Sequence, residues 1–173
     1  LNKLIGLNQL IEGVVYLQIT RGIADRDFIF PEDTPPSIVA FVMDIPLIDT
    51  KESSDGISVV STTDLRWKRR DIKSINLLGQ CLAKQDAHSR NGKEGWMVED
   101  GYVTEGVSSS AYIIKDGRII TRPLSHKILP GVRRRTLLEM QSNEEFEIEE
   151  RLFTLQEAIA ADEAFITSAT QIV

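Results

Sequence analysis

The sequence has very few of the residues that build disulfides and metal centres. It contains one cysteine, Cys81, and two histidines among 173 residues. A single cysteine cannot form an internal disulfide, so a reducing, cytoplasmic compartment is the default expectation. One cysteine and two separated histidines also fall short of the four ligands of a structural zinc site. We therefore expect neither a disulfide scaffold nor a metal site.

Long apolar runs and the common nucleotide-binding motifs are also missing. No apolar stretch approaches the roughly 20 residues that a membrane helix needs, so no membrane partner is expected. The chain has no P-loop, no Gly-x-Gly-x-x-Gly turn and no Gly-x-Ser-x-Gly elbow. Internal repeats and low-complexity tracts are absent as well.

Negative charge is in moderate excess. The chain has 20 Lys and Arg against 26 Asp and Glu, a net charge of −6, and its 42% hydrophobic and 27% charged residues are typical of globular proteins. This composition excludes a disordered chain. Its acidic balance argues against a broad surface for nucleic acid or anionic membranes.

The polar segment at residues 44–55 (DIPLIDTKESSD) separates two apolar regions and predicts an interdomain linker. Residues 1–43 would then end a first, smaller domain, and residues 56–173 would form most of a second. The chain begins at Leu1 rather than at a methionine, and it stops soon after an apolar stretch. We expect a piece of a longer protein that is incomplete at its C-terminus and inactive by itself.

Apolar periodicity predicts alternating helices and strands. Asp100-Gly101 and Asp116-Gly117 each lie between apolar runs, which is the strongest local signal for a hairpin with a type I′ turn. The fold class we expect is mixed α/β, with helices and largely antiparallel sheets. The predicted helices cover residues 2–12, 73–88, 132–141 and 155–161, and the predicted strands cover residues 14–20, 37–43, 57–63, 96–99, 102–105, 111–115, 118–121 and 164–167.

Lys73 follows a basic run and is a candidate Schiff-base lysine. Such a lysine must be neutral to attack a carbonyl, and burial or nearby cations lower the pKa of a lysine towards that state. Four residues of the run provide such cations: Arg66, Lys68, Arg69 and Arg70. The alternative is a solvated basic run or a phosphate-binding patch.

Glu105 is followed by a glycine and, from Ser108 to Ser110, by three serines. A carboxylate that faces a pyridine nitrogen keeps the nitrogen protonated and makes the ring an electron sink. The serine hydroxyls leave room for a ring and supply hydrogen bonds. The alternative is a solvent-facing glutamate at the end of a strand.

The segment 129–136 (LPGVRRRT) predicts a helix that starts after Gly131 with three cations in its first turn. Cations are unfavourable at a helix N-terminus unless an anion binds there, and the free N–H groups of such a terminus suit a phosphate. Hydroxyls of the stretch 167–170 could contact the same anion.

Four segments in this order resemble the fold-type IV pyridoxal-phosphate aminotransferases, and D-amino acid aminotransferases most closely. They are DLRWKRRDIKSINLL at 64–78, VTEGVSSS at 103–110, ILPGVRRRT at 128–136 and FITSAT at 165–170. The resemblance implies that pyridoxal phosphate is the cofactor and that the protein is a cytoplasmic homodimer. The reaction it implies transfers an amino group between a D-amino acid, such as D-alanine, and a 2-oxo acid.

The resemblance also implies roles for individual residues. Lys73 would carry the cofactor and move the substrate proton, and Glu105 would contact the pyridine nitrogen. Arg26 would bind the substrate carboxylate in the neighbouring subunit, where the family has Arg-x-His and this chain has Phe28 in place of the histidine. The remaining cofactor-binding residues would be Ser109, Val132, Arg133, Ser168 and Thr170.

Three other functions remain open from the sequence. A branched-chain aminotransferase and an aminodeoxychorismate lyase share the fold and the lysine. An anion- or nucleic-acid-binding module built on the basic runs at 66–70 and 133–135 is the alternative from another class.

Overall fold

A computed structural model describes residues 1–47, 50–141, 146–170 and 173. It divides the chain into two compact units, Leu1–Thr50 and Lys51–Val173. The division falls inside the polar segment at 44–55. Among the helices formed by the described residues, none is long and apolar enough to cross a membrane.

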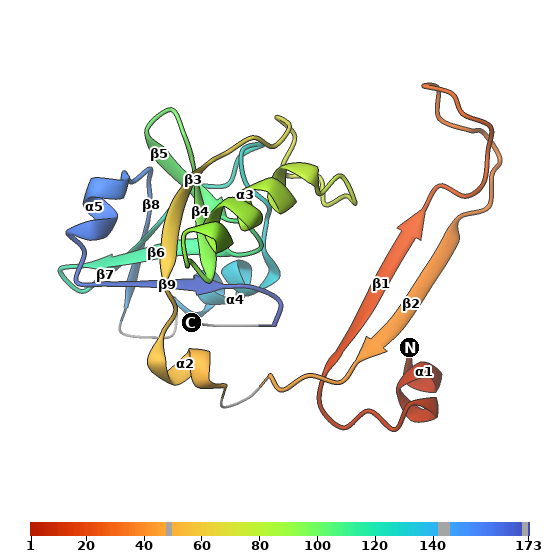
Figure 1. Cartoon of the computed structure of the whole chain (residues 1–173), viewed down its shortest axis with the longest axis horizontal. Helices are drawn as coiled ribbons and strands as arrows, with labels where there is room; N and C mark the ends of the chain where they lie inside the picture. The colour runs from red at the N-terminus through yellow and green to blue at the C-terminus, as the bar shows by residue number, and fades with distance from the viewer. Residues whose placement is uncertain (48–49, 142–145, 171–172) are drawn as a thin grey trace. The chain divides into compact units, whose positions relative to one another are not determined.

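The first unit is a two-stranded antiparallel ribbon with a short helix (Figure 1). Helix α1 covers Asn2–Leu7, and the strands β1 (Val14–Thr20) and β2 (Ser37–Met43) pair along their whole length. The predicted helix 2–12 is too long, because the backbone turns at Gln9, whose φ is +51°. Gly13 is required where the ribbon begins, since a Cβ there would lie 2.2 Å from the carbonyl oxygen of Met43.

The second unit contains two sheets. Strands β3 (Val59–Thr63), β4 (Glu94–Glu99) and β5 (Tyr102–Gly106) form the first sheet, in which β3 and β4 are parallel and are connected through helix α3 (Leu78–Ser89). The second sheet has the order β8-β7-β6-β9. Its strands are β6 (Ser110–Lys115), β7 (Arg118–Thr121), β8 (Glu147–Glu150) and β9 (Glu163–Thr167). The remaining helices are α2 (Lys51–Asp55), α4 (Val132–Met140) and α5 (Leu155–Ile159).

Both predicted hairpins are confirmed. Asp100 and Gly101 have φ values of +55° and +82°, and Asp116 and Gly117 have values of +50° and +76°. Positive φ at both central residues is the requirement of a type I′ turn, whose twist matches that of the flanking strands. The first turn joins β4 to β5, and the second joins β6 to β7.

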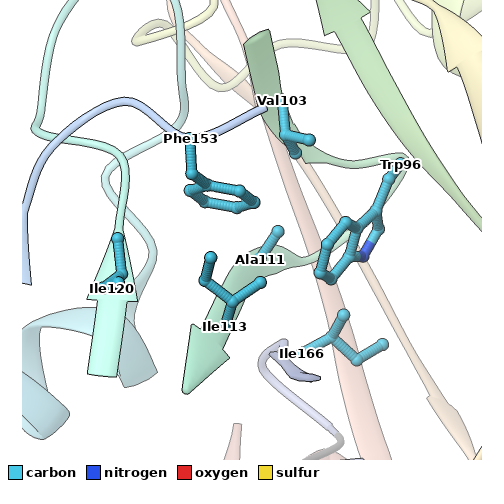
Figure 2. Packing of buried hydrophobic residues seen from close by; sticks show 7 residues of the cluster. All are labelled: Trp96, Val103, Ala111, Ile113, Ile120, Phe153 and Ile166. Atoms are coloured by element: carbon cyan, nitrogen blue, oxygen red, sulfur yellow. The ribbon is translucent and has the colours of Figure 1, made fainter. Parts of the chain in front are cut away.

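The main core lies between the two sheets (Figure 2). Trp96 and Val103 come from the first sheet, and Trp96 meets the ring of Phe153 edge to face at 5.9 Å. Burying side chains of this size stabilises a fold by roughly 1.5–3 kcal/mol each. The cluster consists of Trp96, Val103, Ala111, Ile113, Ile120, Phe153 and Ile166.

Several predicted boundaries are wrong. The helix predicted at 73–88 begins at Leu78, which leaves Lys73 in a loop, and helix α2 lies inside the segment predicted as a linker. Strand β8 was not predicted, because three of its four residues are glutamates, which are uncommon in strands. Smaller differences occur at the starts of the strands predicted at 57–63, 96–99, 111–115 and 164–167, at the end of the strand predicted at 102–105, and at the ends of the helices predicted at 132–141 and 155–161.

Candidate active site

A pocket of about 660 Å³ in the second unit collects most of the predicted site residues. Its wall includes the loop between β3 and α3, the end of β5 with the serines after it, the start of α4 and the end of β9. Six of the eight predicted residues line this pocket: Lys73, Glu105, Ser109, Val132, Arg133 and Ser168. Thr170 lies outside the lining, and Arg26 belongs to the first unit.

Lys73 lies in the irregular segment of residues 64–77, which we call the lysine loop. Its side chain is exposed and has no hydrogen-bond or ion-pair partner within the described part of the chain. The amine is therefore available to a molecule in the pocket.

Three of the four cations predicted around Lys73 face carboxylates, which compensate their charge, whereas Lys68 has no ion-pair partner among the described residues. Arg66 contacts Asp64 at 2.7 Å, and Arg69 contacts Asp71 at 2.8 Å. Arg70 contacts Glu99, also at 2.8 Å. Asp64 and Asp71 lie in the lysine loop itself, whereas Glu99 comes from the end of β4.

Glu105 is the last residue but one of β5, and its side chain is buried. Arg66 donates from Nη1 to its Oε1 at 2.5 Å, and the backbone N–H of Leu129 donates to its two oxygens at 3.2 and 3.1 Å. Burial raises the pKa of Glu105, while Arg66 and the Leu129 amide oppose the rise. The pocket wall thus holds a carboxyl group that is fixed in place by three hydrogen bonds.

Asp64 binds the Arg66 guanidinium that contacts Glu105. Its carboxylate accepts hydrogen bonds from Nε and Nη2 of Arg66 at 2.9 and 2.7 Å and from the hydroxyl of Thr104 at 2.7 Å. Burial acts against the charged form of Asp64, but the hydrogen bonds from Arg66 and Thr104 outweigh burial and lower its pKa. Asp64 therefore orients Arg66 towards Glu105. The contact between Asp64 and Arg66 was not predicted, although the Asp-x-Arg spacing is a local signal for it.

The start of α4 forms another part of the wall. Gly131 precedes the helix with extended backbone, and no side chain within the described residues caps this terminus. The free backbone N–H groups at the start of α4 can donate hydrogen bonds to an anion. Arg134 turns inward to Glu150 and Arg135 pairs with Glu139 along the helix, so Arg133 is the cation of the first turn that lines the pocket.

Hydroxyl groups complete the wall. The hydroxyl of Ser109 donates to Oε2 of the buried residue Glu94 at 3.2 Å. Gly106 leaves room for this hydroxyl, since a Cβ on Gly106 would lie 2.1 Å from the Ser109 hydroxyl oxygen. Glu94 is a second positioning residue that the sequence did not reveal. Thr170 lies 3.3 Å from the Ser168 hydroxyl, oxygen to oxygen, and its backbone N–H also donates to that oxygen, so it supports Ser168 from outside the lining.

Arg26 lies in the loop between β1 and β2. Its guanidinium stands 5.4 Å from the centre of the Phe28 ring. The neighbouring carboxylate of Asp27 accepts the backbone N–H groups of Phe28 and Ile29 instead of pairing with Arg26. Within the described residues, Arg26 has no ion-pair partner.

The pocket combines an exposed lysine amine, a buried carboxyl group and the uncapped N-terminus of α4. The family model of the class IV amino-transferases matches residues 1–173, and the chain belongs to this family. Among curated proteins, it is 38% identical to the D-alanine aminotransferase of Bacillus licheniformis over 98% of this chain and 60% of the relative. It is 39% identical to the D-alanine aminotransferase of Staphylococcus aureus over 97% of this chain and 60% of the relative. The chain thus spans about three fifths of the length of these relatives.

Solved structures of the same fold bear other names. The branched-chain amino acid aminotransferase of Escherichia coli has a TM-score of 0.81 at 21% identity. The match covers 99% of this chain and 59% of the Escherichia coli chain. A Legionella pneumophila protein assigned as a 4-amino-4-deoxychorismate lyase has a TM-score of 0.86 at 20% identity, with coverages of 98% and 63%. The branched-chain amino acid aminotransferase of Thermobaculum terrenum, solved in its PLP form, has a TM-score of 0.76 at 20% identity, with coverages of 92% and 54%. These likenesses confirm the fold.

Proposed function

We propose that the whole protein is a pyridoxal-phosphate-dependent aminotransferase that moves an amino group from a D-amino acid resembling D-alanine to a 2-oxo acid. The observation that carries the proposal is the pocket that groups Lys73, Glu105 and the start of α4. The relatives named D-alanine aminotransferase support the choice of substrate.

The donor set of the pocket fits this cofactor. An unpaired lysine amine suits its aldehyde, and the buried carboxyl group of Glu105 suits its pyridine nitrogen. The free N–H groups of Val132 and Arg133, together with the Arg133 guanidinium, suit its phosphate. Ser109 and Ser168 can hydrogen-bond the remaining polar atoms, and Thr170 supports Ser168.

The residues of this chain would divide the work of the reaction. When bound, the cofactor supplies an electron sink for the electrons released at the substrate α-carbon. Glu105, held by Arg66 and Leu129, would keep a proton at the pyridine nitrogen. Lys73 would hold the cofactor between turnovers, and its amine would then carry the proton from the substrate α-carbon to the cofactor.

Arg26 would bind the substrate carboxylate, since a guanidinium offers two parallel donors. In this proposal the protein is a homodimer, and the loop of Arg26 serves the pocket of the partner subunit. Residues 1–43 would end the small domain, and residues 56–173 would form most of the cofactor-binding domain. Phe28 provides no hydrogen-bond donor from its side chain, so it would contribute an apolar contact.

The alternatives receive less support. The branched-chain aminotransferases and the lyase are about 20% identical to this chain and share only its fold. A nucleic-acid-binding module needs uncompensated positive charge, whereas Arg66, Arg70 and Arg134 are paired with carboxylates and nearly buried.

The test compares three reactions of the full-length protein. We expect pyruvate to form from D-alanine and 2-oxoglutarate, with little product from L-leucine and 2-oxoglutarate or from aminodeoxychorismate. Lys73→Ala is the inactive control, and Lys84→Ala removes another lysine of the pocket lining as a matched control. Faster turnover of L-leucine or of aminodeoxychorismate would overturn the proposal.

A further inference from the structure

The position of Lys73 depends on contacts made elsewhere in its loop. Residues 65–77 form no helix or strand, so no backbone ladder fixes the lysine. In this stretch the side chains of Arg66 and Arg70 are only 5% and 2% exposed, whereas Lys73 is exposed. Arg66 is committed to Asp64 and Glu105, which leaves Arg70, three residues before Lys73, as the buried anchor closest to it in sequence.

Arg70 holds the lysine loop to the end of β4. Its Nη2 donates to Oε1 of Glu99 at 2.8 Å, and its Nη1 donates to Oε2 at 3.3 Å. This two-point contact of a guanidinium with a carboxylate fixes direction as well as distance. Nη1 also lies 3.3 Å from Oδ2 of Asp64, at the start of the same loop.

Arg70 also joins the lysine loop to the segment of residues 122–131, between β7 and α4. Its backbone N–H donates to the carbonyl oxygen of His126 at 2.9 Å, and its Nη1 donates to that of Lys127 at 3.4 Å. Lys127 in turn contacts Glu99 at 2.8 Å. The same segment supplies the Leu129 N–H that binds Glu105, and it ends at Gly131, where α4 begins.

We propose that Arg70 and Glu99 form a clamp that positions the lysine loop, so that Lys73 is held in register with Glu105 and the start of α4. Arg70 is a positioning residue, because it does not contact the reacting atoms and influences Lys73 only through the loop that it anchors. The inference rests on the proposed function in one respect, namely that Lys73 carries the cofactor.

The chain offers a matched control for Arg70. Arg69 precedes it in the same loop and pairs with Asp71 at 2.8 Å, but its side chain is 58% exposed. Arg70→Lys keeps the charge and loses the two-point contact, and Arg69→Lys makes the same change at the exposed pair. Glu99→Gln removes the charge from the other side of the clamp and serves if Arg70→Lys does not fold.

Two measurements on the full-length protein test the clamp. In the cofactor-free protein, we expect Arg70→Lys and Glu99→Gln to speed amide hydrogen exchange in residues 65–77 at least about tenfold, with exchange in β6 and β9 unchanged. After loading with pyridoxal phosphate and reduction with borohydride, the pyridoxyl label on Lys73 should fall several-fold in both variants. Arg69→Lys should match the wild type in both measurements.

The outcomes separate the clamp from the proposed function. An unlabelled Lys73 in the wild type would contradict the proposed function, while hydrogen exchange would still test the clamp. If the wild type is labelled and the clamp variants show wild-type exchange and labelling, the clamp is wrong. If exchange rises equally across the second unit and labelling is retained, Arg70 contributes only to stability, and the inference is also overturned.

Discussion

Glu105 is the residue whose surroundings are most specific in this pocket, because its carboxyl group is buried and held by hydrogen bonds. Arg66 and Leu129 hold it, and Asp64 holds Arg66. These hydrogen bonds hold the two carboxyl oxygens of Glu105 in one arrangement. In the proposed function, a carboxyl group held in this way is preorganised to stabilise the charge that develops in the transition state.

Glu105→Gln keeps the shape of this side chain and removes its charge. We expect the full-length variant to bind pyridoxal phosphate nearly as well as the wild type, with kcat lower by about 10²–10³, because the pyridine nitrogen loses its proton partner. Steady-state kinetics with D-alanine and a cofactor titration measure the two effects separately. A variant with wild-type kcat would make Glu105 a structural residue.

Arg26 is the expected anchor of the substrate carboxylate. Arg26→Lys should raise KM for D-alanine and for 2-oxoglutarate together, since both carry a carboxylate at the same point. The loss of one charge-assisted contact should lower kcat/KM by about one to two orders of magnitude. Arg21→Lys is a control in the same loop, where Arg21 stacks on Phe30 at 3.8 Å. Equal kinetics for Arg26→Lys and the wild type would place the carboxylate site elsewhere.

Glu99 gives the protein a defined response to acid. The hydrogen bond from Arg70, followed by that from Lys127, lowers the pKa of Glu99 from 4.5 to about 2. Because the folded-state pKa lies below the unfolded one, the stabilisation is fully present above about pH 4.5 and is lost as the pH falls towards 2.

Urea unfolding of the cofactor-free, full-length protein at about pH 5 and about pH 3 measures this effect. Glu99→Gln should remove on the order of 1–2 kcal/mol of the pH-dependent loss in unfolding free energy. Identical pH dependence in variant and wild type would show that the Arg70–Glu99 contact is weak in solution.

At the scale of elements, the parts with local rules were predictable and the parts with distant partners were not. Each Asp-Gly pair determines its hairpin within four residues, and both hairpins form as expected. Ile72 and Ile75 are three residues apart, as on one face of a helix, but both side chains are exposed. Helix α3 begins only at Leu78, so the helix predicted from residue 73 starts too early. Arg66 and Glu105 lie 39 residues apart in sequence, so nothing local could indicate their contact.

Helix α5 is short enough that its first turn determines whether it forms. Thr154 accepts a hydrogen bond from the Glu157 N–H at 3.2 Å, and Glu157 accepts one from the Thr154 N–H at 2.9 Å, which is a capping box. Thr154→Ala should cost about 1 kcal/mol and lower Tm by a few °C. Thr136→Ala, inside α4, should leave Tm nearly unchanged, and an equal effect of the two changes in calorimetry would contradict the capping role.

At the scale of the whole molecule, the chain joins a strand ribbon to a two-sheet unit that contains the pocket. Membership of the class IV amino-transferases was predictable from four short segments, because they hold the lysine, the glutamate and the helix start in a fixed order. The pocket forms from residues of the second unit alone. These 173 residues span about 60% of the length of the relative from Bacillus licheniformis, and we predict that by themselves they show no aminotransferase activity.

The central claim is that Lys73 carries pyridoxal phosphate in this pocket. The most direct measurement is borohydride reduction of the full-length protein loaded with the cofactor, followed by digestion and mass spectrometry of the peptides. We predict a pyridoxyl label on Lys73 and none on Lys84, which lines the same pocket. A label on Lys84 or Lys68, or no label at all, would contradict the account.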